Sequence, residues 1–209
     1  MSGRTILYVR HAESVANAGG ITLPNNEIPL SEAGKQAALE LAEWLPAEPA
    51  LVLVSKALRT QQTAEPYCRR TGAVPVVEPL LDEFSIICPS LIEGMDGPQR
   101  RVVVRPLWEE PAPHRRSGPQ ADTFMEFQGR VRRFVDERLD ELPDGTVVFG
   151  HGIWLGLLLW HALGHQADDS AGVKVFRRFQ QGLPVPNCAV YGLRFLALSL
   201  GPSADTVRQ

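Results

Sequence analysis

Four side chains that could act on a phosphate group each follow a short apolar run of the chain: Arg10, His11, Arg59 and His151. A neutral imidazole is a good nucleophile toward phosphorus, and its attack gives a phosphohistidine intermediate. Guanidinium groups donate paired hydrogen bonds to phosphoryl oxygens and stabilise the charge that develops there during transfer. A nearby carboxylic acid can protonate the leaving oxygen. These residue types together suit phosphoryl transfer, and no step of that reaction requires a metal.

The elements that must position these side chains are predicted from the pattern of apolar residues. Short apolar runs predict strands at 6–9, 51–54, 74–77, 146–149 and 189–196. Helical spacing predicts helices at 31–45, 58–70, 123–139 and 153–163. Because strands that are apolar on both faces alternate with helices, we expect an α/β fold, a three-layer α/β/α sandwich with a mostly parallel sheet. Pro75 places its strand near an edge of that sheet.

The side chains that directly follow the strands should meet at one edge of the sheet. Ligands of open α/β sheets bind at the carboxyl ends of the strands, and the two histidines and two arginines all lie at such ends. Three acidic residues follow the strand at 74–77: Glu78, Asp82 and Glu83. We also expect a helix to begin after His11 and to present its N-terminal amides to a bound anion.

The composition excludes several other classes of protein. A length of 209 residues, with 44% hydrophobic and 22% charged residues, predicts a single globular domain over 1–209. A net charge of -3 disfavours a nucleic-acid partner. Three cysteines without a C-x-x-C pair argue against a disulfide framework and against a structural zinc site. No apolar run is long enough for a signal peptide or a membrane span, so we expect a cytoplasmic protein without membrane contact.

Regular patterning stops between 94 and 122, where proline, glycine and arginine dominate. We therefore expect a loop-rich lid insertion over 84–122. Five arginines lie between residues 100 and 116 of this insertion: Arg100, Arg101, Arg105, Arg115 and Arg116. Either they form a solvated loop, or the segment 100–116 binds a second anionic group on the substrate.

Four segments of the chain, in order, carry known motifs. Arg-His-Ala-Glu-Ser at 10–14 is followed by Asn17, and Pro-Leu-Ser-Glu-Ala-Gly-Lys-Gln-Ala occupies 29–37. Ser-Lys-Ala-Leu-Arg-Thr-Gln-Gln-Thr-Ala occupies 55–64, and Gly-His-Gly occupies 150–152. This set resembles the histidine phosphatase superfamily, also called the phosphoglycerate-mutase-like superfamily. The resemblance implies the same sandwich fold.

The resemblance also implies roles for single residues. His11 would be the phosphorylated nucleophile, and the phosphoryl group would be bound by Arg10, Arg59 and His151. Glu83 would be the proton donor and then the base for water, while Ser14 and Asn17 would be secondary contacts. The stretch at 84–89 departs from the family's usual Gly-x-Trp-x-Gly-like sequence. Three nearby acids therefore remain alternatives for the proton donor: Glu78, Asp82 and Glu93.

The expected activity is metal-independent hydrolysis of a phosphomonoester, with no cofactor. The chain lacks the Trp-Asn and Gly-Trp pattern usual after the nucleophile of the mutase branch, and it is short for a mutase. A mutase that needs a bisphosphate primer, or a non-catalytic module that binds a phosphorylated ligand, are the alternatives. The expected partner is a small phosphorylated substrate, with a phosphoprotein as the alternative. The sequence determines neither which phosphomonoester is used nor the oligomeric state.

Overall fold

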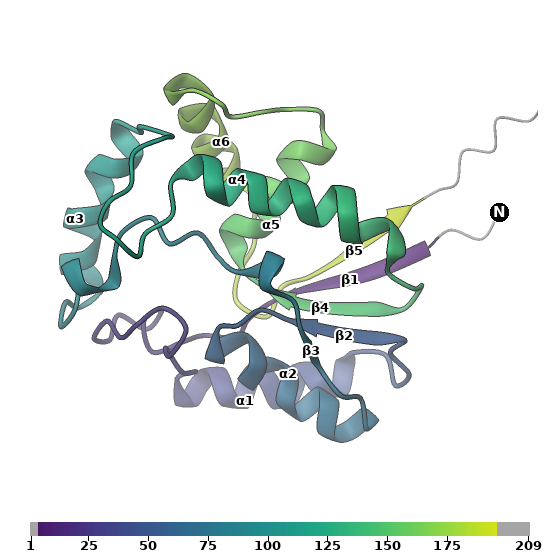
Figure 1. Ribbon diagram of the computed structural model, residues 1–209. Helices are drawn as coiled ribbons and strands as arrows, with labels where there is room; N and C mark the ends of the chain where they lie inside the picture. Colours follow the sequence, from purple (N-terminus) through teal and green to yellow (C-terminus); the bar gives the residue numbers. More distant parts are fainter. Residues whose placement is uncertain (1–3, 196–209) are drawn as a thin grey trace, which may run out of the picture.

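A five-stranded sheet lies at the centre of the computed structural model, which describes residues 4–195 (Figure 1). Its order is β3-β2-β4-β1-β5, and its strands are β1 (Arg4–Arg10), β2 (Leu51–Val54), β3 (Val76–Val77), β4 (Thr146–Gly150) and β5 (Val190–Phe195). Strands β1 to β4 are parallel, and β5 runs antiparallel to β1. The predicted mostly parallel sheet is confirmed. Leu196, the predicted end of the last strand, lies outside the described residues.

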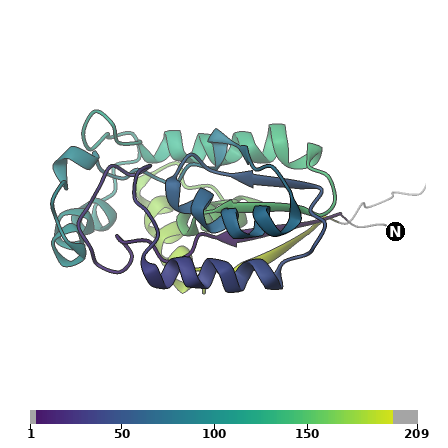
Figure 2. The same ribbon diagram turned by 90° about the horizontal axis from the view of Figure 1, so that it is seen from below.

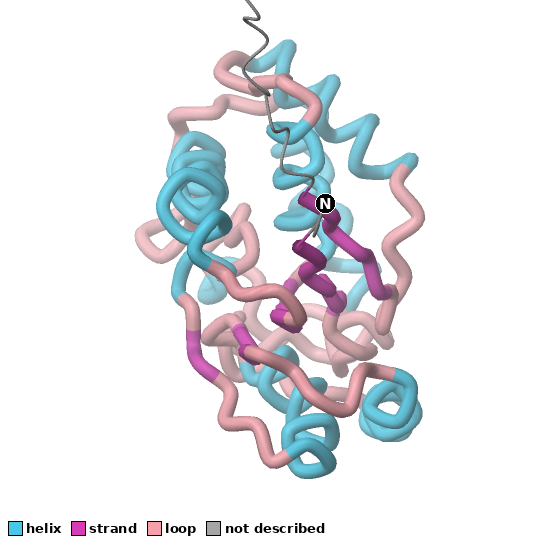
Figure 3. The backbone as a smooth tube through the Cα atoms, turned by 90° about the vertical axis from the view of Figure 1, so that its right-hand side faces the viewer, coloured by secondary structure: helices cyan, strands magenta, loops and turns pink. Residues whose placement is uncertain are grey.

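Helices cover both faces of this sheet (Figures 2 and 3). The helices of residues 4–195 are α1 (Glu32–Trp44), α2 (Leu58–Thr71), α3 (Gly97–Glu109), α4 (Phe124–Arg133), α5 (Gly152–Ala162) and α6 (Ser170–Gly182). Neighbouring residues of a strand point to opposite faces, so Val9 and Phe149 pack with α1 and α2, while Tyr8 and Val148 pack with α4 and α5. Helix α6 packs against α5. The three-layer sandwich is confirmed.

The register of β1 against β4 brings the two histidines together. Arg10 lies opposite Gly150, and the His11 amide donates to the Gly150 carbonyl at 3.0 Å. Because the two strands are parallel and end level with each other, the next residue of each, His11 and His151, must emerge side by side. The pairing of these two strands, which are far apart in the sequence, therefore places the two histidines next to each other.

Helix α4 begins where the sequence provides a cap. The Thr123 hydroxyl accepts from the Glu126 amide at 3.1 Å, and the Glu126 carboxylate accepts from the Thr123 amide at 2.7 Å, which starts α4. The predicted helix at 123–139 continues past α4 as a wide turn, Phe134–Arg138, and a tight one, Leu139–Glu141. Further 3₁₀ turns span Pro79–Leu81 and Pro89–Leu91.

The connecting segments differ from the expectations in two places, and they include one helix that the sequence did not predict. The insertion at 84–122 is not all loop, because the 13-residue helix α3 lies within it. Asp96 and Gln99 start α3 by reciprocal side-chain-to-amide bonds of 2.9 Å, but the helix buries little surface and so shows little apolar patterning. Helix α6 was not predicted at all. No helix follows His11: the chain from 12 to 30 forms turns, pinned by a bridge between Ser14 and Leu30.

Within residues 4–195, no helix combines the length and the apolar character needed to cross a membrane.

Candidate active site

A cavity of about 310 Å³ opens at the carboxyl ends of β1 and β4. Six of the seven predicted site residues line it: Arg10, His11, Ser14, Asn17, Arg59 and Glu83. The seventh, His151, is fully buried directly behind, with its ring centre 5.3 Å from that of His11 and the two planes at 65°. The structure therefore brings all seven residues together, although they come from four separate segments of the chain: 10–17, 59, 83 and 151.

His11 is held as a neutral ring with its lone pair on Nε2. Its Nδ1 lies 2.7 Å from the Ala12 carbonyl, which can only accept a hydrogen bond, so the ring proton is on Nδ1. Its Nε2 then carries the lone pair and accepts from Arg59 Nε at 3.3 Å. Burial, together with the charge of Arg59, lowers the pKa of His11 to about 3. At neutral pH the ring is thus in the form that a nucleophile requires.

Arg59 lies between the two imidazole rings. Besides its contact with His11, its Nη2 faces His151 Nδ1 at 3.3 Å and its Nη1 donates to the Asn25 carbonyl at 2.6 Å. Arg59 is in the first turn of α2, which is anchored by a bond of 2.8 Å from the Leu58 amide to the Asn26 carbonyl. Burial lowers the pKa of the guanidinium to about 10, so it stays charged at neutral pH.

His151 is oriented by a chain of hydroxyl groups. The Thr60 hydroxyl donates to the Ala57 carbonyl at 2.7 Å, so its oxygen is free to accept from Ser55 Oγ at 2.9 Å. Ser55 Oγ in turn accepts from His151 Nε2 at 2.8 Å. This leaves the lone pair of His151 on Nδ1, the atom that faces Arg59. Burial, with the nearby Arg59 charge, lowers the pKa of His151 well below its ordinary value.

The two glycines beside His151 allow its neighbours to approach closely. The Tyr8 hydroxyl accepts from the His151 amide at 2.7 Å and donates to the His151 carbonyl at 3.1 Å. A Cβ on Gly150 would lie 2.1 Å from that hydroxyl oxygen, and one on Gly152 would lie 3.3 Å from Arg10 Nε. Tyr8 therefore clamps the backbone of His151 only because residue 150 has no side chain.

Glu83 lies at the N-terminus of α5. Its carboxylate accepts from the amides of Ile153 at 3.0 Å and Trp154 at 3.1 Å, both in the first turn of the helix. Burial raises the pKa of Glu83, and the hydrogen bonds from backbone amides partly offset that rise. The helix N-terminus of this site is therefore that of α5, and it holds a carboxylate. The helix expected after His11 would have offered its amides to the substrate instead.

The three alternative proton donors point elsewhere. Asp82 accepts from the Lys56 amide at 3.0 Å and lies 3.6 Å from its ammonium group. Glu78 is paired with Arg138 at 3.1 Å, and Glu93 is exposed to solvent. Of the four acids considered, Glu83 is the one that lines the cavity with His11.

Ser14 and Asn17 are hydrogen-bonded to each other. The Ser14 hydroxyl and amide both donate to Asn17 Oδ1, at 3.0 and 3.2 Å. Ser14 is buried, whereas Asn17 lies on the cavity wall, and its side-chain Nδ2 has no hydrogen-bond partner among residues 4–195. Arg10 donates through Nη1 to the Val185 carbonyl, and its buried Nε has no hydrogen-bond partner within the same residues. Both groups are donors available to a bound anion.

Several supporting residues were missed by the sequence analysis, although they lie inside the motifs. Thr63 Oγ1 accepts from the Ala12 amide at 3.0 Å, and Gln62 Oε1 accepts from the Leu30 amide at 2.8 Å. A Cβ on Gly34 would lie 2.0 Å from the Glu13 carbonyl oxygen. The motif at 55–64 thus attaches α2 to the loop that carries His11. The hydroxyl and amide residues of this motif could have been recognised from the sequence as supporting residues, whereas no sequence pattern marks Tyr8.

Comparison with known proteins agrees with this geometry. The family model of the histidine phosphatase superfamily, branch 1, matches residues 6–195. The chain belongs to the histidine phosphatase superfamily. It is 28% identical over 167 residues to a probable phosphoglycerate mutase GpmB of Yersinia enterocolitica, covering 76% of this chain and 74% of that protein. A second probable phosphoglycerate mutase GpmB, from Cronobacter sakazakii, is 28% identical over 168 residues, with the same coverage.

Solved structures of other proteins have the same fold. A mycobacterial glucosyl-3-phosphoglycerate phosphatase superposes with a TM-score of 0.69 at 23% identity, over 92% of this chain and 91% of that one. A putative alpha-ribazole-5'-P phosphatase from Escherichia coli gives a TM-score of 0.69 at 22% identity, over 90% and 89% of the two chains. The predicted phosphoglycerate-mutase-like sandwich is confirmed.

Proposed function

We propose that this histidine phosphatase superfamily member hydrolyses a phosphomonoester through a phosphohistidine formed at His11 Nε2. The observation that carries the proposal is the state of that nitrogen. It is unprotonated, it lies in a cavity, and its neighbour is a charged guanidinium. The naming of structural neighbours as phosphatases supports the same activity.

In the first half-reaction, the lone pair of His11 Nε2 attacks phosphorus and the bond from phosphorus to the ester oxygen breaks. Arg59 and the unpartnered Nε of Arg10 donate to the phosphoryl oxygens, where negative charge develops. Protonated Glu83 gives its proton to the leaving alkoxide, which departs as an alcohol. Burial favours this role, because it raises the pKa of Glu83 and so keeps more of the carboxyl protonated.

In the second half-reaction, the Glu83 carboxylate takes a proton from water as the water oxygen attacks phosphorus. The bond from phosphorus to His11 Nε2 breaks, inorganic phosphate leaves, and both residues return to their starting states. His151 becomes protonated at Nδ1 when a phosphoryl dianion sits nearby, since that charge opposes the effect of burial on its pKa. It then serves as a further donor to the phosphoryl group.

A mutase is the second candidate, because the curated relatives bear that name. The first half-reaction is common to both activities, and they differ in the acceptor. In a phosphatase the acceptor is water, whereas in a mutase it is a hydroxyl group of a phosphorylated acid. A mutase would therefore need a bisphosphate primer, and it would isomerise its substrate without releasing phosphate.

The test combines a trapping experiment with the variants His11→Asn and Glu83→Gln. Acid-labile label from ³²P-phosphomonoester should appear on the wild-type protein and on the exposed control His114→Asn, but not on His11→Asn. With p-nitrophenyl phosphate, whose leaving group departs without a proton, Glu83→Gln should give a burst of p-nitrophenol and then stall as phosphoenzyme. Trapped label on His11→Asn contradicts the mechanism, and primer-dependent isomerisation without phosphate release would identify the mutase.

A further inference from the structure

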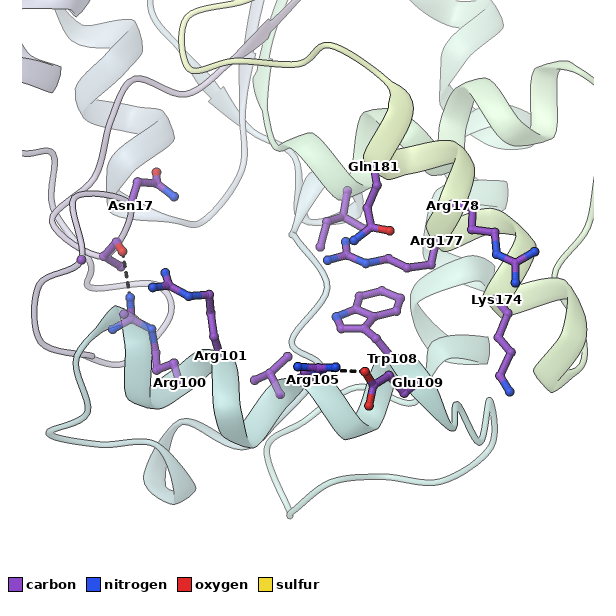
Figure 4. A pocket seen from close by; sticks show the side chains of 15 residues that line it. Asn17, Arg100, Arg101, Arg105, Trp108, Glu109, Lys174, Arg177, Arg178 and Gln181 are labelled. Atoms are coloured by element: carbon purple, nitrogen blue, oxygen red, sulfur yellow. Dashed lines mark hydrogen bonds and ion pairs between the residues drawn. The ribbon is translucent and has the colours of Figure 1, made fainter.

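A second, larger cavity adjoins the one that holds His11. Its volume is about 1080 Å³, and it shares Ala16, Asn17 and Ile153 with the smaller cavity. Figure 4 shows its two facing walls, with side chains of α3 along one and side chains of α6 along the other. A phosphoryl group bound at His11 would therefore have its leaving group directed toward a space far larger than a small alcohol needs.

The walls of this cavity are strongly positive. Six cationic side chains line it, and the one carboxylate among its lining residues is Glu109: the cations are Arg100, Arg101, Arg105, Lys174, Arg177 and Arg178. The chain as a whole has a net charge of -3, so this excess is local. Clefts lined by charge of one sign concentrate ligands of the opposite sign.

The cations differ in whether they are already engaged. Arg100 donates to the carbonyls of Ala16, Gly20 and Met95, so it ties α3 to the loop after His11 and is not available to a ligand. Arg105 is paired with Glu109 at 2.6 Å. By contrast, three exposed cations have no ion pair within residues 4–195: Arg101, Lys174 and Arg178.

Arg177 is held in place without being neutralised. Its guanidinium lies over the Trp108 ring, 4.3 Å from the ring centre, and the Trp108 and Phe84 rings pack in a T-shape with their centres 5.7 Å apart. Its Nη1 donates to Gln180, but its buried Nε has no hydrogen-bond partner in the described residues. A desolvated donor without a partner is costly, and a ligand that accepts from it would remove that cost. Figure 4 shows this side chain extending over Trp108 into the cavity.

We propose that the cavity between α3 and α6 binds a second anionic group, so that the substrate is a phosphomonoester whose leaving alcohol carries a carboxylate or a second phosphate. This inference rests on the proposed function. The second anion is bound by the unpaired cations Arg101, Arg177 and Arg178. The sequence suggested a basic lid at 100–116 alone. In the proposed site the second anion is instead bound by arginines of both α3 and α6. Arg100 is already bonded to backbone carbonyls, and Arg116 is paired with Glu126.

Matched substrate pairs test the proposal on the wild-type protein. One pair is 6-phosphogluconate and sorbitol 6-phosphate, which differ by a carboxylate. The other is fructose 1,6-bisphosphate and fructose 6-phosphate, which differ by a phosphate. In at least one pair, one charge-assisted hydrogen bond should raise kcat/KM about tenfold for the member that carries the second anionic group. The preferred pair identifies the second anion, and equal kcat/KM within both pairs overturns the proposal.

Two variants show which residues cause the preference. Arg177→Gln and the double variant Arg101→Gln/Arg178→Gln should each reduce about tenfold the ratio of kcat/KM for the member with the second anionic group to kcat/KM for the member without it. The control is Arg132→Gln, which changes an exposed arginine that lines a different cavity, and it should keep the wild-type ratio. A ratio unchanged in both cavity variants also overturns the proposal.

A binding measurement separates this proposal from the proposed function. Calorimetric titration of the same pairs into His11→Asn, which cannot form a phosphohistidine, reports the second-anion site without turnover. Tighter binding of the anionic member supports the site even if the wild-type protein hydrolyses nothing, an outcome that would refute only the phosphatase. Equal binding of both members, beside measurable hydrolysis of p-nitrophenyl phosphate, refutes only the second-anion site.

Discussion

The neutral state of His11 should make the protein less stable in acid by an amount that can be isolated. Its pKa falls from an ordinary value of 6.5 to about 3 in the folded protein, mainly because the ring is buried. Between those values the unfolded chain binds a proton that the folded chain does not, so stability falls as the pH falls. Each pH unit below 6.5 lowers the free energy of unfolding by about 1.4 kcal/mol, so at pH 5 the neutral His11 should lower it by about 2 kcal/mol.

The assay compares urea unfolding of the wild-type protein and His11→Asn at pH 7 and pH 5. Asparagine does not titrate, and its amide can still donate to the Ala12 carbonyl that His11 contacts. The wild-type protein should lose about 2 kcal/mol more than the variant between the two pH values. The control His114→Asn, at an exposed position, should follow the wild-type protein. Equal losses in wild type and His11→Asn would refute the assignment of His11 as a buried neutral ring.

Two further substitutions test the support of His151. Ser55→Ala removes the acceptor for His151 Nε2, and kcat/KM should fall about ten- to a hundredfold, with a changed His151 tautomer in ¹⁵N NMR spectra. An unchanged tautomer would contradict the hydroxyl chain. Gly150→Ala places a methyl group 2.1 Å from the Tyr8 hydroxyl and should destabilise the fold by about 1–3 kcal/mol in thermal unfolding. Its control is Gly129→Ala on α4, where nothing lies within 4 Å, and which should raise stability by up to about 1 kcal/mol.

The sequence predicts those strands and helices whose formation depends mainly on neighbouring residues. The strand at 51–54 and the helices that begin near 31, 58, 123 and 153 were found from apolar periodicity and from caps such as Ser31 and Thr123. These signals need only neighbouring residues. The sequence does not predict α3, because this helix buries little apolar surface and shows correspondingly weak periodicity. It also does not predict α6.

The sequence by itself determined which residue types stand at strand ends, and so which chemistry the chain could perform. Three matters were decided only in the folded molecule. Glu83 rather than Asp82 faces His11, because the amides of α5 hold its carboxylate. Ser55, which follows β2, sets the tautomer of His151, and Arg59 of α2 faces the lone pairs of both imidazoles. The cations that remain unpaired are chosen by distance to carboxylates and carbonyls, which depends on how distant segments pack and not on the order of residues along the chain.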